Sequence, residues 1–260
     1  MLSFIVPAHN EQLLIGRTLG ALHTAGQAQR EPYEIIVADD ASTDETGTIA
    51  RAYGAQVVSV NHRHIAATRN AGARQARGEL LFFVDADTLV PESVVCEAVR
   101  AMRRGAIGGG CVFRFDGRLP LWARIVYPFT VPIMRLAKLV GGCSLFCTQD
   151  AFRAVGGFDE QYYAAEEMAF IAALKRRGRV MIPRACVTTS GRKFRTLPTR
   201  EVLALLLRVV LDGPDSFRRR DGLEAWYGSR QSDLEQRSNP QVTAPCRQPL
   251  ADSCAIHRGA

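Results

Sequence analysis

The stretch Leu80-Leu81-Phe82-Phe83-Val84-Asp85-Ala86-Asp87 decides the fold class of this sequence. It begins with five apolar residues that do not alternate with polar ones, a pattern typical of a strand buried on both faces of a parallel sheet. Two acids follow at the point where the strand ends. In an open parallel sheet ligands bind beyond the carboxyl ends of the strands, so these acids lie where a ligand site is expected.

The sequence on both sides of this stretch alternates between strand and helix patterns. Strand patterns precede it at residues 2–6, 33–38 and 56–60, with helical patterns at 11–25, 45–53 and 65–77 between them, and a further helix is expected at 91–103. Such alternation predicts an α/β domain with a mostly parallel central sheet and helices on both faces, a Rossmann-like architecture.

The pattern is less regular in the second half of the chain. The run Gly108-Gly109-Gly110 follows a helix and precedes a strand pattern at 111–115, so we expect a tight turn or bulge and not a dinucleotide-binding loop, which follows a strand. Further short strands are expected at 144–148, 180–182 and 186–189, helices at 149–155, 166–177 and 199–211, and an irregular helical segment at 121–139.

The positive charge of the chain is concentrated in one segment. The 260 residues carry a formal net charge of +7, and residues 175–220 contain thirteen Lys and Arg against three acids. Anionic lipid, nucleic acid or a phosphate-bearing ligand would each suit such a segment, and a solvated basic face explains it equally well.

The seven cysteines are odd in number and irregular in spacing, which favours buried free thiols in a reducing compartment such as the cytoplasm. No signal peptide is expected at the N-terminus. The apolar stretches at 125–134 and 202–211 are shorter than the roughly 18 residues that a membrane-spanning helix needs.

Acidic residues follow three of the predicted strands. Glu11 comes after the first, Asp39 and Asp40 come after the second, and Asp85 and Asp87 follow the fourth. Carboxylate oxygens suit Mg²⁺ or Mn²⁺, and Mg²⁺ commonly combines one or two carboxylates with substrate phosphate oxygens. The sequence therefore predicts a divalent-metal site at Asp85 and Asp87, the alternative being a turn before a helix. Ser42 and Glu45 have the spacing of a helix capping box.

Several motifs occur in the order and spacing of a known family. They are Val6-Pro7-Ala8-His9-Asn10-Glu11, Val37 to Asp44 (VADDASTD), Arg69-Asn70-Ala71-Gly72, Val84 to Thr88 (VDADT), Gly156 to Glu160 (GGFDE) and Ala165-Glu166-Glu167. Over about residues 2–190 this sequence resembles the family 2 glycosyltransferases. The resemblance implies a glycosyltransferase-A fold and an inverting transfer from a nucleotide-diphosphate sugar. The Q-x-x-R-W motif of processive members is not present, which favours transfer of a single sugar.

The resemblance also implies which residues form the site. The nucleotide-sugar site would comprise Pro7, Ala8, Asn10, Glu11, Asp39, Asp40, Arg69, Asn70, Asp85, Ala86 and Asp87, and the basic loop at 190–195 adds Arg192 and Lys193 as candidates. Relatives carry an E-D pair whose acid is the catalytic base, and this chain has Glu166-Glu167 in its place. Position favours Glu167, although both acids would also favour a helix N-terminus.

From these observations we expect one catalytic domain over residues 1–231, followed by a disordered tail at 232–260. Residues 1–118 would bind the nucleotide sugar, and 119–231 would form the acceptor half and a C-terminal helix. The expected donor is a UDP sugar, and the acceptor is an unknown hydroxyl, for which a lipid-linked compound is one candidate. We expect a cytoplasmic protein that attaches to the membrane surface and does not bind nucleic acid.

Two other functions fit parts of the sequence. A sugar nucleotidyltransferase shares the architecture and metal use, but it would carry a Gly-rich basic loop after the first strand, where this chain has Pro7 to Glu11. A non-catalytic membrane-surface module would use the basic segment, but it would not need acids at three strand ends.

Overall fold

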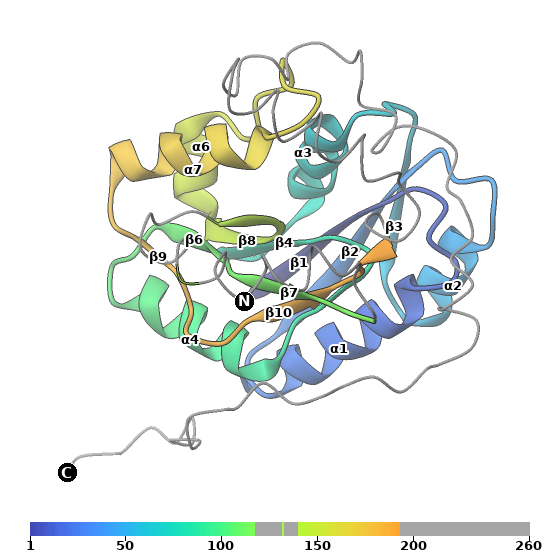
Figure 1. Cartoon of the computed structure of the whole chain (residues 1–260), viewed down its shortest axis with the longest axis horizontal. Helices are drawn as coiled ribbons and strands as arrows, with labels where there is room; N and C mark the ends of the chain where they lie inside the picture. The colour runs from blue at the N-terminus through green and yellow to red at the C-terminus, as the bar shows by residue number, and fades with distance from the viewer. Residues whose placement is uncertain (118–131, 133–139, 193–260) are drawn as a thin grey trace.

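A seven-stranded sheet forms the centre of the computed structural model, which describes residues 1–117, 132 and 140–192 (Figure 1). The strand order is β3-β2-β1-β4-β8-β6-β9. The strands are β1 (Leu2–Ala8), β2 (Tyr33–Asp40), β3 (Gln56–Val60), β4 (Leu80–Val84), β6 (Gly108–Cys111), β8 (Gly141–Thr148) and β9 (Val180–Met181). Only β8 runs against its neighbours, β4 and β6, so the prediction of a mostly parallel sheet is confirmed.

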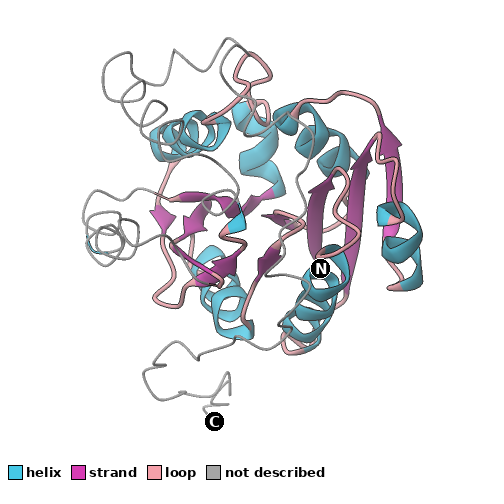
Figure 2. Ribbon diagram, turned by 45° about the vertical axis from the view of Figure 1, so that its right-hand side comes forward, coloured by secondary structure: helices cyan, strands magenta, loops and turns pink. Residues whose placement is uncertain are grey.

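Helices cover both faces of this sheet (Figure 2). On one face lie α1 (Ile15–Gln27), α2 (Thr46–Ala52) and α4 (Glu92–Arg103); on the other lie α3 (Ile65–Gln75), α6 (Gln149–Val155) and α7 (Glu166–Arg177). The helices pack closely, since a Cβ placed on Gly72 of α3 would lie 2.5 Å from a methyl carbon of Ile5.

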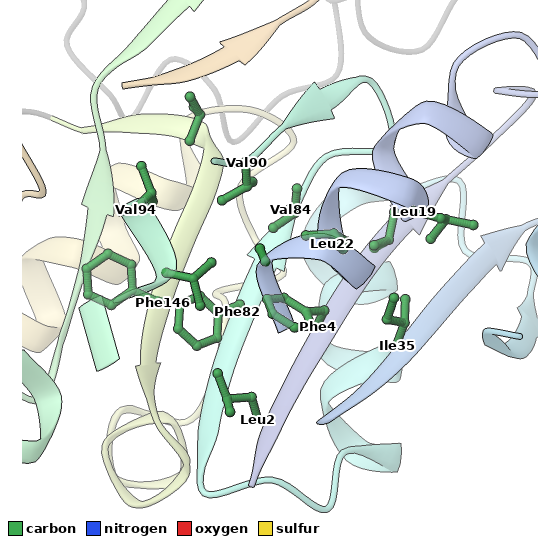
Figure 3. Close-up of a cluster of buried hydrophobic side chains, with 14 of the residues drawn as sticks. Leu2, Phe4, Leu19, Leu22, Ile35, Phe82, Val84, Val90, Val94 and Phe146 are labelled. Carbon is green, nitrogen blue, oxygen red and sulfur yellow. The ribbon is translucent and has the colours of Figure 1, made fainter. Parts of the chain in front are cut away.

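Each helix layer encloses an apolar core. Figure 3 shows the core beneath α1 and α4, where Phe4, Phe82 and Phe146 from three neighbouring strands lie side by side. The opposite core contains Phe83, Phe158 and Phe170. Burial of each such ring removes it from water and contributes about 1.5–3 kcal/mol to stability.

A small second sheet lies beside the main one, with the order β5-β10-β7. Its strands are β5 (Thr88–Leu89), β7 (Phe113–Phe115) and β10 (Val187–Thr189). Strand β5 directly follows the Asp85-Ala86-Asp87 turn, and β10 directly precedes the basic loop. The small sheet therefore brings these two segments together.

Most predicted elements are confirmed, several with identical bounds. Residues 56–60, 80–84, 149–155 and 166–177 form the expected strands and helices. The first helix begins at Ile15 and not at Glu11, because residues 9–14 form turns that contact the β2–α2 loop. Ser42 and Glu45 do not form a capping box. Helix α2 begins at Thr46, and the Ser42 hydroxyl accepts a hydrogen bond from Asn10 N and not from the helix.

Of the two structures expected for the glycine run, the tight turn is wrong, whereas the bulge agrees with a register shift between β6 and β8 at Gly110 and Cys111. Gly108, Gly109 and Gly110 are not a turn but the buried strand β6, and the expected strand at 111–115 is divided between two sheets. The run forms a strand because neighbouring backbone passes too close for side chains. A Cβ on Gly108 would lie 2.6 Å from the Phe146 carbonyl oxygen, and one on Gly109 would collide with the Met181 carbonyl oxygen.

We expect the substitution Gly109→Ala to lower the free energy of unfolding by about 3 kcal/mol or more, because overpacking against backbone forces the strands apart. Gly20→Ala is the matched control. Gly20 lies in the interior of α1 with its nearest neighbour at 3.9 Å, so alanine there should stabilise the helix by about 0.5–1 kcal/mol. Urea unfolding of both variants measures this difference, and equal effects would contradict the close approach of β6 and β9.

Several predictions concern residues outside the described ranges. These are the segment at 121–139, the helix at 199–211, Lys193, the tail from 232, and the domain boundaries at 118 and 231. Within the described ranges, no helix has both the length and the apolarity needed to cross a bilayer.

The cysteine prediction is confirmed in part. Cys111, Cys143 and Cys147 are buried free thiols, and Cys186 is free and half-buried. Burial raises the pKa of the Cys147 thiol well above its usual value, so this thiol is neutral and unreactive. For Cys96 the prediction is wrong, because Cys96 is disulfide-bonded.

Candidate active site

The candidate site lies at the carboxyl edge of the main sheet. Strands β1, β2 and β4 run parallel, and the register pairs Ala8 with Asp39 at their ends. The segments that follow these strands, at 9–11, 41–45 and 85–87, therefore meet at the same edge. The buried residues Pro7 and Ala8 end β1 there. The sequence-based placement of acids at neighbouring strand ends is confirmed.

Asp40 holds the surrounding loops together. Its carboxylate accepts hydrogen bonds from the backbone N–H groups of His62, Arg63 and His64 at 2.7, 2.9 and 3.2 Å, and from the Thr68 hydroxyl at 2.7 Å. Burial opposes ionisation of Asp40, but these donors outweigh it and hold the pKa of the carboxyl below its usual value. Asp40 thus orders the β3–α3 loop.

Asn10 and Asp39 line the edge of the site between β1 and β2. Asn10 has a positive φ of 51°, and its side-chain oxygen accepts a hydrogen bond from Thr43 N at 2.8 Å, which joins the two loops. Asp39 is half-buried beside the start of α2, and one of its oxygens accepts a hydrogen bond from Ser42 N at 3.3 Å. Of the two adjacent aspartates, Asp39 is therefore the better placed for a ligand.

Arg69 joins the two halves of the site. Its guanidinium is 2.7 Å from an Asp85 oxygen, 2.5 Å from a Glu166 oxygen and 2.8 Å from the Gly142 carbonyl oxygen. The Arg69 side chain is 3% exposed, and the two carboxylates raise its pKa further although burial opposes this. A permanently charged guanidinium thus connects the strand end of β4 to the first residue of α7.

Glu166 is buried and lies among other charges. Burial and repulsion by Glu167 raise the pKa of Glu166 to about 8, against the opposing attraction of Arg69. Its side chain is 5% exposed and is directed at Arg69. Glu166 is therefore placed to hold Arg69 in position, and burial keeps it away from an incoming acceptor.

Glu167 differs from its neighbour in exposure. It is half-buried, and a Cβ placed on Gly142 would lie 3.0 Å from its carboxyl carbon. The absence of a side chain at Gly142 leaves the room in which the Glu167 carboxylate lies. Of the two adjacent glutamates, Glu167 is the more exposed.

Asp87 faces the basic loop. One of its oxygens accepts a hydrogen bond from the Thr189 hydroxyl at 3.3 Å, and the other lies 3.9 Å from the Arg192 guanidinium. Arg192 also forms a bidentate pair with the buried Glu11 at 3.0 and 3.2 Å. Glu11, Asp87 and Arg192 come from three distant parts of the sequence and meet at this corner.

The structure adds one residue that the sequence did not indicate. The Asp116 carboxylate accepts a hydrogen bond from Gly191 N at 2.9 Å and so anchors the loop that carries Arg192. Asp116 directly follows β7, which ends where the predicted strand at 111–115 ends, so the rule that acids at strand ends mark the site would have found it.

Asn70 and Ala86 have structural contacts. The side chain of Asn70 accepts a hydrogen bond from Phe158 N and donates one to Phe158 O, both at 2.9 Å, and it donates a further one to Glu160. Ala86 is buried, and its carbonyl oxygen accepts a hydrogen bond from the Thr18 hydroxyl at 2.8 Å. Asn70 therefore fixes the GGFDE segment before α7, and the predicted nucleotide contact by Asn70 remains untested.

The donor set at Asp85 and Asp87 is consistent with a divalent cation bound together with a diphosphate. No group of three or more His, Cys, Asp or Glu side chains able to hold a metal occurs in the described part of the chain. Both aspartates lie near a guanidinium in this structure, which is consistent with a position that attracts cations. Two carboxylates with added phosphate and water oxygens match the ligands that Mg²⁺ prefers.

We expect the pKa of Glu166 to make stability depend on pH. A folded pKa near 8 lies above the usual 4.5, so the stability contributed by the protonated group is complete at acid pH and falls as the pH rises toward 8. Gln at this position stays neutral. The wild-type protein should therefore lose more thermal stability than Glu166→Gln between pH about 5 and pH about 9. Parallel pH profiles of Tm for the two proteins would contradict the raised pKa.

Together these features define the class of protein. A mostly parallel α/β sheet carries acids at three strand ends, with a paired-carboxylate turn after β4 and two adjacent glutamates opposite it. The family model described as "Glycosyl transferase family 2" matches residues 3–155, which is more than half of the chain. The chain therefore belongs to glycosyl transferase family 2.

Curated relatives carry the same family region within longer chains. Validoxylamine A glucosyltransferase of Streptomyces hygroscopicus subsp. limoneus is 34% identical over 131 residues, which cover 46% of this chain and 28% of that protein. The 4,4'-diaponeurosporenoate glycosyltransferase of Staphylococcus aureus (strain USA300) is 49% identical over 59 residues, which cover 23% of this chain and 15% of that protein. The matched region thus spans less than a third of these relatives.

Solved structures share the fold. Mannosyltransferase PcManGT from Pyrobaculum calidifontis, in complex with GDP-Man and Mn²⁺, aligns with a TM-score of 0.61 and 24% identity, covering 80% of this chain and 60% of that one. TarS 1-349 from S. aureus, in complex with UDP-GlcNAc, aligns with a TM-score of 0.56 and 18% identity, covering 91% and 77%. The glycosyltransferase-A fold implied by the sequence is confirmed.

Proposed function

We propose that this protein transfers a single sugar, with inversion, from a nucleotide-diphosphate sugar to an acceptor hydroxyl. The observation that carries the proposal is the Asp85–Arg69–Glu166 connection. It links Asp85, one of the paired aspartates where a donor diphosphate would bind, through Arg69 to Glu166, whose neighbour Glu167 would face the acceptor. Family membership supports the same activity.

The donor would lie along the carboxyl edge of the sheet. Asp39 near the end of β2 would accept hydrogen bonds from the nucleoside, and Arg192 beside Asp87 would bind the diphosphate. Asp85 and Asp87 would hold Mg²⁺ or Mn²⁺. When bound, such a cation offsets the negative charge that develops on the departing nucleotide diphosphate.

Proton transfer is assigned to Glu167. The half-buried Glu167 carboxylate would accept the proton of the acceptor hydroxyl as its oxygen attacks the anomeric carbon. The sugar–phosphate bond breaks on the opposite side, and the nucleotide diphosphate leaves with the bonding electron pair. Attack and departure on opposite faces invert the anomeric centre, and no covalent enzyme intermediate is needed.

The proposal assigns a UDP sugar as the donor. Structures of similar fold contain UDP, UDP-GlcNAc or GDP-Man, and Mn²⁺ is present in some of them. A thermal-shift screen of nucleotide sugars with and without Mn²⁺ tests the assignment, followed by measurement of nucleotide release. A ligand at 100 times its Kd should add about 2.7 kcal/mol of stability. If no nucleotide sugar raises Tm and none is turned over, the proposed function is wrong.

We further propose that the protein acts at a membrane surface. The basic charges that begin at the end of α7, together with the apolar stretches predicted from the sequence, support attachment to anionic lipid and access to a lipid-linked acceptor. We expect flotation with phosphatidylserine vesicles at low salt. Binding should weaken above about 0.15 M salt, because exposed charges are then screened over about 8 Å. Failure to float even at low salt would rule this out.

A further inference from the structure

A cavity of about 180 Å³ lies beside α7 at the β9 edge of the main sheet. Its lining includes Ile171 and Lys175 of α7, Gly109 of β6, Met181 of β9 and Val140 just before β8. Apart from Lys175 this lining is apolar. Pockets that hold a whole small ligand usually measure about 300–1,000 Å³, so this cavity suits one part of a larger ligand.

The cavity lies on the same side of α7 as the candidate base, Glu167. Glu167, Ile171 and Lys175 follow one another at intervals of four residues, so they lie along one stripe of α7. Each step advances about 6 Å along the helix axis. The opposing segment follows the same order, since Gly142 lies against Glu167 and Val140 lines the cavity. The base and the cavity are thus adjacent on one surface.

The character of this stripe changes along its length. It begins with the half-buried carboxylate of Glu167, continues with the buried Ile171 and ends with the exposed Lys175. The last turn of α7 also carries Arg176 and Arg177, so the far end is strongly cationic. A complementary ligand has a hydroxyl at one end, an apolar middle and an anionic group at the other end.

We propose that this cavity is an acceptor subsite for an amphipathic hydroxyl compound. Its hydroxyl lies at Glu167, its apolar part lies in the cavity beside Ile171, and its carboxylate or phosphate pairs with Lys175. The inference rests on the proposed function, because that function supplies the reason for a hydroxyl at Glu167.

The test uses the full chain and ω-hydroxydecanoate, a linear probe with a hydroxyl and a carboxylate at its ends. Calorimetric titration without donor should show binding, and neutral decanediol should bind about 10-fold more weakly because it lacks the charge paired with Lys175. A parallel titration with ω-hydroxydecyl phosphate decides between carboxylate and phosphate as the anion.

The matched variants are Lys175→Glu and Arg176→Glu. Both residues are exposed on the last turn of α7, but only Lys175 lines the cavity. We expect Lys175→Glu to weaken probe binding about 10-fold, Arg176→Glu to leave it unchanged, and Lys175→Arg to restore it. Val140→Trp, which fills the cavity, should abolish binding.

If Lys175→Glu and Arg176→Glu weaken probe binding equally, the effect comes from the overall positive charge of this surface, and the proposed subsite is wrong. Absence of probe binding to the wild-type protein would also overturn it, for instance if a segment of this chain fills the cavity. Donor turnover measured alongside separates the two proposals. If the protein turns over a nucleotide sugar but does not bind the probes, the proposed function stands and the acceptor subsite is wrong. If it binds the probes but turns over no nucleotide sugar, the proposed transferase function is wrong.

Discussion

Replacement of Glu167 by Gln should reduce sugar transfer by about 100-fold or more, because a positioned general base contributes about 10²- to 10⁴-fold to the rate. Gln keeps the size and hydrogen-bonding ability of the side chain but cannot accept the proton. Donor affinity should stay nearly unchanged, since Glu167 lies on α7 beside Gly142 and is proposed to act on the acceptor. Single-turnover transfer together with the donor Kd measures both effects.

Two controls accompany this variant. Glu92→Gln makes the same change in the first turn of α4, where the residue is exposed, and should leave transfer unaffected. Glu166→Gln should reduce the chemical step less than Glu167→Gln, because Glu166 is directed at Arg69. If Glu166→Gln is inactive and Glu167→Gln is active, Glu166 is the base and the two roles are reversed. If both variants are active, the base is a different residue.

Loss of the divalent cation should have a comparable effect. We expect EDTA to abolish transfer and Mn²⁺ or Mg²⁺ to restore it. Asp87→Ala should weaken donor binding by about 100-fold or more, because even the outer-sphere partners of a bound metal are worth about 10- to 100-fold. The Asp87 side chain is 16% exposed and lies beside the small sheet, so its removal should leave the fold intact. Donor Kd in the presence of Mn²⁺ measures the change.

Asp150→Ala serves as the matched control for Asp87→Ala. Asp150 is an exposed acid in the first turn of α6, away from the strand ends that form the site, so its loss should change neither metal dependence nor donor Kd. Full transfer in EDTA would contradict the metal assignment for Asp85 and Asp87. If Asp87→Ala leaves donor affinity unchanged, Asp87 is not a ligand of the metal.

The sequence anticipated the parts of the fold in which local pattern and tertiary context agree. The apolar run Leu80–Val84 becomes a strand buried on both faces, and the helix Glu166–Arg177 ends at Gly178 as its pattern indicates. The sequence did not indicate the buried strand at Gly108–Cys111, because glycine ordinarily signals a turn or a bulge. Here it is required by the closeness of the Phe146 and Met181 backbones, which belong to strands distant in the sequence.

By itself, the sequence determined the fold class and the edge of the sheet at which the acids gather, because both follow from the period of the apolar residues and from what comes after each strand. Only the tertiary structure decided what each acid does. Asp40 orders loops while the adjacent Asp39 faces the site, and Glu166 is bound to Arg69 while Glu167 remains accessible. Adjacent residues on a strand or helix point in different directions, so their partners are set by packing between elements far apart in the chain.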